Sequence, residues 1–316
     1  MLRYLKYMLR IRRVEFRIAE IPILAIPLLL MLTDATFLRT SYFWEGVLIF
    51  FLLFAFGDIV NCLADRDLDA VYKPHLSEAV YGLGVRFVTF QVYATAFLAL
   101  AFAAHLSWRL NRWQLFALVA VGLALGAAYS VEPLRLKRRG LAQLVCLWLI
   151  IFVGPMLFVA TLVGSFPTLT VLLFAAAYGT LQMGVILVNT AEDYPEDLAA
   201  GIETTVVTLG LRRGITLAFW MTLAGAVGVL ALLIRLFSGR QTSSLHLLAL
   251  LPAVAACIYV TGDIRRLQHA VEAQGLDEGI RTVKRAARRV PLWVTLVAWS
   301  ILGAALALFL TGGGRD

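Results

Sequence analysis

The sequence predicts an all-α integral membrane protein, a bundle of nine transmembrane helices with a central cavity open toward the cytoplasmic side. Three observations favour this fold class. The 316 residues are 61% hydrophobic and only 15% charged, whereas soluble domains are about 45–50% apolar and about 25% charged. The apolar residues gather in segments of about 20 residues, the length that crosses a bilayer as a helix. The basic residues flank these segments.

Nine segments are apolar enough to be transmembrane helices. The first two contain or adjoin acidic residues, whereas the fifth and sixth lie in a stretch from residue 141 to 191 that has no charged residue. Together the nine predict a single membrane domain over residues 1–316. The segments cover roughly residues 17–36, 42–63, 87–106, 113–131, 141–163, 168–190, 214–235, 245–264 and 290–311.

The Lys and Arg residues predict the orientation of the bundle. With nine spans, 22 of the 28 lie on the same side of the membrane as the N-terminus, and 6 lie on the other side. Because cytoplasmic loops carry an excess of Lys and Arg, we expect a plasma-membrane protein with its N-terminus in the cytoplasm and its C-terminus outside. Basic residues that flank apolar segments suit anionic membrane lipids and argue against a nucleic-acid partner.

Two matched acidic segments follow the second and sixth predicted helices. Residues 61–69 (NCLADRDLD) and 189–197 (NTAEDYPED) share the pattern Asn-x-x-x-Asp-x-x-x-Asp, and equivalent positions are 128 residues apart. The segments contain two of the three asparagines and five of the ten aspartates in the chain. An acidic cap at the membrane surface would explain the charges but not the matched spacing. Motif one is therefore defined as Asn61, Asp65 and Asp69, and motif two as Asn189, Asp193 and Asp197.

This spacing has a structural meaning, because residues four apart lie near one face of a helix. Each motif is predicted to place an amide and two carboxylates in a row at the cytoplasmic end of its helix. If the two helices meet, four carboxylates face one another and repel unless cations are present. Hard oxygen ligands suit Mg²⁺, which usually binds one or two carboxylates plus substrate phosphates. We therefore expect Asp65, Asp69, Asp193 and Asp197 to bind Mg²⁺.

Acidic residues near the motifs have other expected roles. Asp67, Glu192 and Glu196 lie off the main row and are expected to be solvated or to support the metal ligands. Asp58, one turn before Asn61, could reach the cavity or form an internal pair.

The basic segment after the fourth predicted helix, residues 129–140 (YSVEPLRLKRRG), is a candidate diphosphate site. Lys137 and Arg138 follow a proline-containing turn at a helix end, whereas Arg135 and Arg139 are expected from topology alone. Tyr129 is either an interfacial or a cavity-facing aromatic residue. Residues 265–289 are predicted to lie at the anionic leaflet as an amphipathic helix with no catalytic role.

Taken together, these motifs resemble those of the UbiA superfamily of intramembrane prenyltransferases. Motif one matches the first family motif, Asp193 and Asp197 match the second, and residues 129–140 and 201–210 resemble two further conserved turns of that family. Cys62 stands where the first motif usually has an aspartate, and Thr190 takes the matching place in the second. The segment of residues 72–77 lacks the arginine that usually follows Pro74, so Lys73 is the candidate phosphate partner there.

The resemblance implies the transfer of a prenyl group from a polyprenyl diphosphate donor to an aromatic or otherwise lipophilic acceptor, with Mg²⁺ as cofactor and release of diphosphate. Lys73, Lys137, Arg138 and Tyr129 would then bind the diphosphate. Asn61 and Asn189 would orient the diphosphate or the carboxylates and would act in catalysis with the four aspartates. The small-molecule or lipid acceptor and the prenyl chain length stay open.

Three other functions remain as alternatives. A transporter could also hold intramembrane acids, but here the acids lie at one membrane face and no helix break near the midplane is evident. A phosphatidyl-type alcohol transferase would carry the pattern D-G-x-x-A-R, which is missing. A non-catalytic family member that only binds lipids is favoured by Cys62 alone.

Overall fold

The protein is helical throughout the part of the chain that a computed structural model describes, residues 2–164, 167–239 and 244–312. Helix makes up 89% of the structure, and these residues form no strand. A single isolated bridge joins Arg139 to Glu203 within them. The predicted all-α class is therefore confirmed.

Eight helices in the described ranges are long and apolar enough to cross a membrane, and they correspond to the second through ninth predicted segments. One of them, Leu141–Val163, is built from α7 (Leu141–Leu147), a π-helical turn η4 (Trp148–Val153) and α8 (Gly154–Val163). The others are α3 (Ser41–Tyr72), α5 (Val85–Leu110), α6 (Trp113–Ser130), α9 (Leu169–Glu192), α12 (Leu211–Gly239), α13 (Leu251–Ala273, extended to Leu247 by the 3-10 turn η5) and α15 (Val290–Gly312).

The first predicted segment, residues 17–36, forms a shorter helix than expected. Helix α2 (Arg17–Met31) has 15 residues, about 22 Å at 1.5 Å per residue, which is less than the bilayer core. Leu32, directly after the helix, is extended, and Asp34 accepts a hydrogen bond of 2.6 Å from the backbone of Thr36, a local bond that competes with helix. The predicted count of nine spans is thus not confirmed, although α2 packs against α8 and α15 within the bundle.

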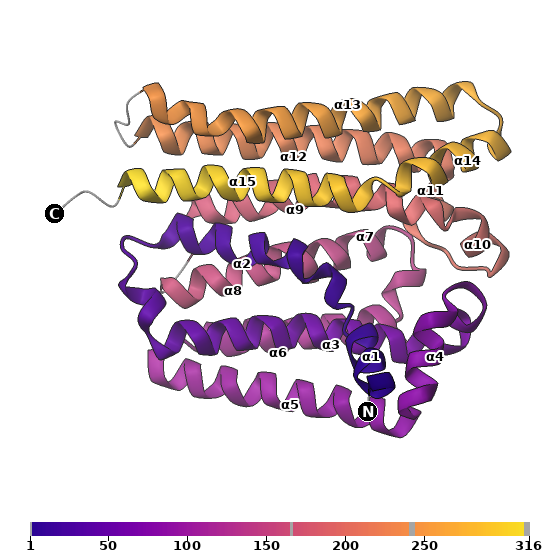
Figure 1. Cartoon of the computed structure of the whole chain (residues 1–316), viewed down its shortest axis with the longest axis horizontal. Helices are drawn as coiled ribbons and strands as arrows, with labels where there is room; N and C mark the ends of the chain where they lie inside the picture. Colours follow the sequence, from indigo (N-terminus) through magenta and orange to yellow (C-terminus); the bar gives the residue numbers. More distant parts are fainter. Residues whose placement is uncertain (1, 165–166, 240–243, 313–316) are drawn as a thin grey trace.

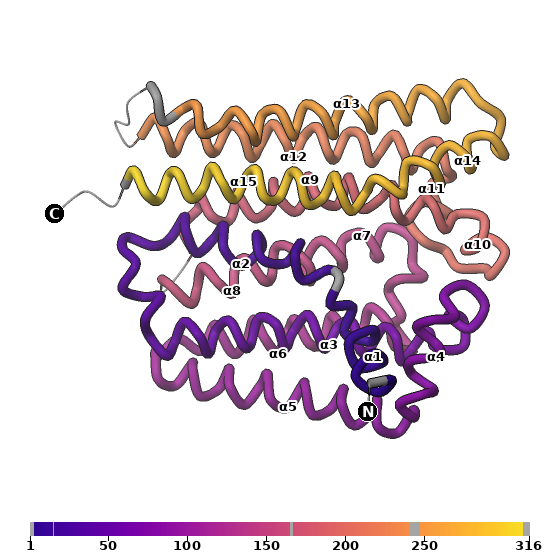
Figure 2. Tube along the Cα trace, viewed as in Figure 1, coloured from indigo at the N-terminus to yellow at the C-terminus, as the bar shows by residue number. Residues whose placement is uncertain are grey.

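The long helices lie side by side, and the short helices gather at one end of the bundle (Figure 1). These short helices are α1 (Leu2–Ile11), α4 (Pro74–Leu83), α10 (Tyr194–Ala199), α11 (Thr205–Leu209) and α14 (Leu276–Ala287). We call this end the motif end. The trace in Figure 2 shows that α15 finishes at the opposite end. The expected cytoplasmic opening of a central cavity stays a prediction, as does the position of the C-terminus, whose last residues, 313–316, lie outside the described ranges.

Helices α9 and α12 pack backbone to backbone through glycines. A Cβ atom on Gly225 of α12 would come within 2.2 Å of the backbone nitrogen of Leu181, and one on Gly184 of α9 would come within 2.5 Å of the backbone nitrogen of Thr222. Small residues allow such close approach between membrane helices. Helix α9, which leads into motif two, is therefore held firmly inside the bundle.

Candidate active site

Motif one lies on the last turns of α3, which continues beyond its predicted end at residue 63 to Tyr72. Because the helix is unbroken, Asn61, Asp65 and Asp69 share one face, as the spacing predicts. Motif one is largely enclosed, since only 12% of the Asp65 side chain and 8% of Asp69 are exposed. Motif one is thus a partly buried row of one amide and two carboxylates.

Motif two departs from the predicted single row. Asn189 lies in the last turn of α9, Asp193 forms the junction, and Asp197 lies on α10. Pro195 causes the break, because proline lacks the N–H for an intrahelical bond and clashes with the preceding turn. The N–H of Asp197 still donates to the carbonyl of Asp193 at 2.8 Å, so the two carboxylates remain one turn apart.

Two cations from the segment after α6 bind the carboxylate of Asp65. Arg135 Nη2 lies 3.2 Å from Oδ1, and Lys137 Nζ donates to Oδ2. Lys137 Nζ also lies 3.3 Å from Asn61 Oδ1, which accepts a second hydrogen bond from Ser130 Oγ at 3.2 Å. Burial lowers the pKa of Lys137, while Asp65 favours its charged form. Asn61, Asp65 and Lys137 therefore form one hydrogen-bonded group.

Arg135 is a site residue that the sequence interpretation missed, having assigned it to topology alone. The signal that could have found it is its place in the segment of residues 129–140, which resembles a family turn. Arg135 adopts a positive φ of 37° there, which non-glycine residues rarely take. The neighbouring Arg138 has a buried Nε with no hydrogen-bond partner among the described residues. A buried donor without an acceptor is unusual in proteins, and here it suits an anion beside Lys137.

Lys73 connects the two motifs. It follows motif one at the junction of α3 and α4, and its Nζ lies 3.4 Å from Asp193 Oδ2 of motif two. Its charge also acts on Asp69 and Asp197. The side chains of Lys73 and Asp193 are both a little under half exposed. The two acidic motifs therefore face one another across a lysine.

The pKa of Asp197 is raised to about 6, chiefly by burial and further by the neighbouring carboxylate of Asp193. A hydrogen bond from Thr204 and the charge of Lys73 oppose this rise. Closely spaced carboxylates that are partly desolvated bind protons more readily than free ones. The same environment favours a bound cation.

Tyr129 lies between the motifs, which favours the cavity-facing interpretation of this residue over the interfacial one. Its hydroxyl group hydrogen-bonds to Gln143, and the charges of Asp65 and Asp197 both act on it. Asn189, by contrast, is exposed at the end of α9, and within the described ranges its side chain makes no hydrogen bond. The structure thus joins Asn61, Asp65 and Lys137 by hydrogen bonds and pairs Lys73 with Asp193. Within the described ranges, no hydrogen bond or ion pair ties the side chains of Arg138 or Asn189 to the motifs.

Two residues that flank the predicted site have structural roles. Asp58 forms the internal pair, since its Oδ2 lies 2.7 Å from Arg17 Nη2. Cys62, which replaces a usual aspartate, is 1% exposed and packs with Ile59, Leu76 and Val80 in an apolar cluster beneath α1 and α4. Its side chain therefore belongs to the packing between helices and not to the row of carboxylates.

The oxygen atoms of the two motifs suit Mg²⁺, although the described residues form no metal site before substrate binds. Among the described residues no three Asp, Glu, His or Cys side chains converge as a metal site, and Asp65 and Asp193 are paired with cations. The ligands on offer are carboxylate and amide oxygens, which Mg²⁺ prefers. Since Mg²⁺ usually combines one or two carboxylates with substrate phosphates, these residues fit a metal that arrives with a diphosphate.

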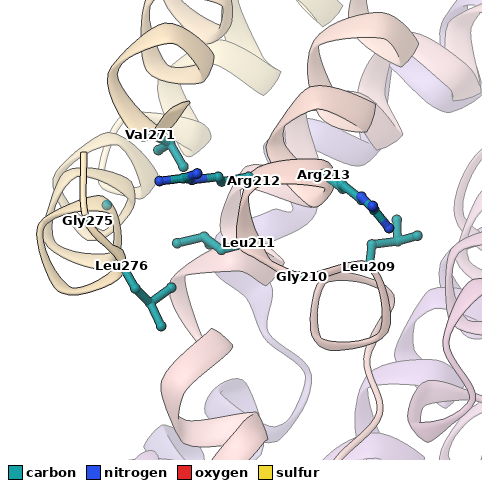
Figure 3. A pocket seen from close by; sticks show the side chains of 9 residues that line it. Leu209, Gly210, Leu211, Arg212, Arg213, Val271, Gly275 and Leu276 are labelled. Atoms are coloured by element: carbon teal, nitrogen blue, oxygen red, sulfur yellow. The ribbon is translucent and has the colours of Figure 1, made fainter. Parts of the chain in front are cut away.

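A separate pocket lies among helices α11 to α14 (Figure 3). Its walls come from the joint between α11 and α12, from the end of α13 and from the start of α14, and no motif residue lines it. The lining is mostly apolar, with Arg212 and Arg213 as its charged residues. The acidic motifs therefore do not depend on this pocket.

Comparisons with known proteins identify the family. Residues 21–275 match the model of the UbiA prenyltransferase family. The 2-carboxy-1,4-naphthoquinone phytyltransferase of Synechocystis sp. is 31% identical over 111 residues, 34% of this chain and 35% of that protein. The bacteriochlorophyll synthase 33 kDa chain of Rhodobacter capsulatus is 29% identical over 184 residues, 53% of this chain and 57% of that protein. The matched regions thus span between a third and just over half of these relatives.

The fold also agrees with a solved structure. A UbiA homolog from Archaeoglobus fulgidus, bound to DMAPP and Mg²⁺, aligns with a TM-score of 0.64 at 18% identity, over 93% of this chain and 98% of that chain. At this level of identity the likeness concerns the fold alone. The family match over most of the sequence carries the conclusion that the chain belongs to the UbiA prenyltransferase family.

Proposed function

We propose that this protein transfers a prenyl group from a polyprenyl diphosphate to a lipophilic acceptor within the membrane and releases diphosphate in a Mg²⁺-dependent reaction. The observation that carries the proposal is the meeting of the two motifs at one end of the bundle through Lys73 and Asp193. Family membership supports it, as does the shared fold of a homolog that binds DMAPP and Mg²⁺.

In this proposal Asp65, Asp69, Asp193 and Asp197 hold Mg²⁺. When bound, Mg²⁺ supplies the positive charge that stabilises the departing diphosphate. The arrangement predicts an exchange of partners, because Arg135 and Lys137 bind Asp65 in the free protein. Once the substrate is present, these two cations turn to the diphosphate oxygens.

The remaining polar residues position the leaving group. The buried Nε of Arg138 gains an acceptor in the diphosphate, and Lys73 neutralises charge from the side of motif two. Tyr129 and Asn61 orient the diphosphate. The bond between the allylic carbon and the diphosphate oxygen then breaks, and its electrons leave with the diphosphate. The acceptor attacks the allylic cation and loses a proton, which the diphosphate or water accepts. Electrostatic stabilisation of this kind often lowers the activation barrier more than any other catalytic effect.

The apolar bundle has a chemical role in the same scheme. A long prenyl chain would lie among the membrane helices, and exclusion of water protects a reactive cation from hydrolysis. We infer that the motif end faces the cytoplasm with the N-terminus, as the basic residues predict, so that a soluble diphosphate leaves into the cytoplasm and the C-terminus lies outside. The acceptor is an aromatic or other lipophilic molecule.

Transport is the rival function, and the π-helical turn η4 bears on it. Irregular helices line the substrate sites of many transporters, and η4 interrupts a membrane span. However, its residues Trp148–Val153 have the sequence WLIIFV, without a polar ligand for a transported ion. The ionisable groups of the site lie instead at the motif end.

A product assay tests the proposal. The purified full chain in lipid vesicles is incubated with a prenyl diphosphate, Mg²⁺ and a panel of aromatic and lipid acceptors, and mass spectrometry detects prenylated products. Lipids that copurify with the protein guide the choice of acceptor. A prenylated product together with stoichiometric diphosphate supports the proposal. Uptake of a solute into the vesicles with no prenylated product from any acceptor would contradict it and favour transport.

A further inference from the structure

Helix α14, together with the end of α13, forms the segment of residues 265–289, whose expected place at the lipid leaflet stays a prediction. It joins α13 to α15 and packs against α9 (Figure 1). Its buried face is formed by Gly279, Val283, Ala286 and Ala287. The apolar face of this amphipathic helix therefore lies on protein, close to motif two.

Polar contacts fix α14 at both ends. From the middle of the helix, Thr282 Oγ1 donates to Oε1 of Gln274, just before α14, at 2.9 Å, and Arg212 of α12 donates to the carbonyl of Gln274 at 2.8 Å. Just beyond its end, Arg289 Nη1 lies 2.9 Å from Asp263 Oδ2, a carboxylate that is 3% exposed on α13. Because the helix is anchored on α12 and α13, it can act as a rigid support.

One side chain of α14 reaches into motif two. Lys284 Nζ lies 2.6 Å from Glu196 Oε1, and Glu196 sits on α10 directly before Asp197. The charge of Lys284 also acts on Glu192, at the end of α9. The other basic residues of this helix, Arg281 and Arg285, pair with Glu278 on the same helix. Lys284 thus differs from its neighbours by joining two elements.

Helix α10 depends on contacts with other elements, such as the one between Lys284 and Glu196, to stay in place. It has only six residues, and helices of that length are unstable alone in water. It is separated from α9 by the break at Asp193 and from α11 by Gly201, whose φ is +64°. Neither end of α10 is therefore held by a continuous helix, although it carries Asp197.

We propose that Lys284 is a positioning residue of the active site: through Glu196 it ties α10 to the anchored helix α14 and so places Asp193 and Asp197 for Mg²⁺. This inference rests on the proposed function. Residues that orient metal ligands typically contribute about 10- to 100-fold to metal affinity. Because Lys284 acts through α10 rather than on a ligand directly, we expect a loss near the lower end of that range.

The direction in which Mg²⁺ affinity changes when Lys284 is removed distinguishes a positioning role from a purely electrostatic one. Lys284 is a cation near the metal site, so its removal would tighten Mg²⁺ binding if it acted only through space. If it positions α10, its removal weakens Mg²⁺ binding even though a repelling charge is lost. The two explanations predict opposite shifts.

The experiment measures Mg²⁺ affinity in two ways, with the full chain in detergent or vesicles. One is the Mg²⁺ concentration that half-saturates prenyl transfer. The other needs no turnover and is the Mg²⁺ dependence of the melting temperature in the presence of inorganic diphosphate. For Lys284→Met we expect the half-saturating Mg²⁺ to rise about tenfold with kcat at saturating Mg²⁺ unchanged. Lys284→Arg should behave as wild type, and so should the matched control Arg281→Met.

Two further measurements connect the effect to Glu196. In a Glu196→Gln background, Lys284→Met should have no additional effect, because a pair that acts as a unit shows full coupling in a double-mutant cycle. Amide hydrogen exchange in residues 194–199 should be faster in Lys284→Met and in Glu196→Gln than in wild type. The exchange measurement is independent of activity and covers the case in which one variant is poorly produced.

Clear results would overturn the inference. Tighter Mg²⁺ binding in Lys284→Met would mean that Lys284 acts only through its charge. If Lys284→Met lowers the Mg²⁺ affinity as much in the Glu196→Gln background as in wild type, Lys284 does not act through Glu196. If amide hydrogen exchange in α10 is the same in the variants as in wild type, the Lys284–Glu196 contact does not hold this helix in place. If wild-type protein itself shows neither prenyl transfer nor a Mg²⁺-dependent melting temperature, the proposed function fails, whereas the exchange data still decide whether Lys284 holds α10.

Discussion

Replacing Lys137 by methionine should change metal binding and catalysis in opposite directions. Lys137 is enclosed, with 11% of its side chain exposed, and it binds both Asp65 and Asn61 in the free protein. It therefore competes with Mg²⁺ for Asp65 before the substrate arrives and serves the diphosphate afterwards. Methionine keeps the apolar stem of the side chain and removes only the charge.

The magnitudes follow from these two roles. If the competing pair contributes about 1.4 kcal/mol, its loss strengthens Mg²⁺ binding in the absence of diphosphate by about tenfold. Arg135 remains on Asp65, so this carboxylate is not left without a cation, and we expect an unfolding free energy lower by only about 1 kcal/mol. Loss of a charge at the leaving group should reduce kcat by about 100-fold to 1000-fold.

Two assays check this prediction. The Mg²⁺ dependence of the melting temperature without diphosphate reports the affinity of the free site, and diphosphate release at saturating Mg²⁺ reports kcat. Arg139→Met is a matched control, because among the described residues the guanidinium group of Arg139 bonds only to the carbonyl of Pro133. Weaker Mg²⁺ binding with an unchanged kcat in Lys137→Met would refute the exchange of partners at Asp65.

Other predictions concern single residues around the same site. Arg138→Met should raise the KM for the prenyl diphosphate with little change in melting temperature, because its buried Nε has no acceptor among the described residues; steady-state kinetics measure this, and an unchanged KM would contradict it. The half-saturating Mg²⁺ should rise as pH falls below about 6, because the raised pKa of Asp197 lets a proton compete with the metal, and a Mg²⁺ titration that is flat between about pH 5 and pH 7 would exclude this competition. Cys62→Ala should keep prenyl transfer, whereas Cys62→Asp should lower the melting temperature, since it buries a carboxylate in an apolar cluster; a gain of activity in Cys62→Asp would contradict the packing role.

The helices were largely predictable from the sequence because their length and apolar composition are local properties. The end of α2 was not, since the apolar segment runs on past Met31 while the chain leaves the helix at Leu32 and then forms the local bond between Asp34 and the backbone of Thr36. The break between α9 and α10 had a visible cause in Pro195, but the shared spacing of the two motifs suggested two identical helical rows. A four-residue spacing therefore places side chains on one helix face only where the helix continues without a break.

The candidate site was predictable to the extent that it depends on spacing. Motif one followed from its four-residue period, and Lys137 followed from its place after a helix end. Arg135 and Lys284 could not be found in this way, because the first depends on an unusual backbone conformation and the second on a contact across 88 residues. Tertiary packing also decided the role of Cys62, which sequence alone placed beside the metal ligands.

The most direct test of the central claim is diphosphate release by membranes that contain equal amounts of wild type, Asp65→Asn, Asp193→Asn and the control Asp67→Asn. Asp67 lies beside motif one but is exposed and bound by Tyr81, so its variant should match wild type. If the two motifs form one Mg²⁺ site, wild-type release requires Mg²⁺ and stops in excess chelator, and both motif variants lose it. Release that persists in chelator, or in Asp193→Asn at wild-type rate, would contradict the account.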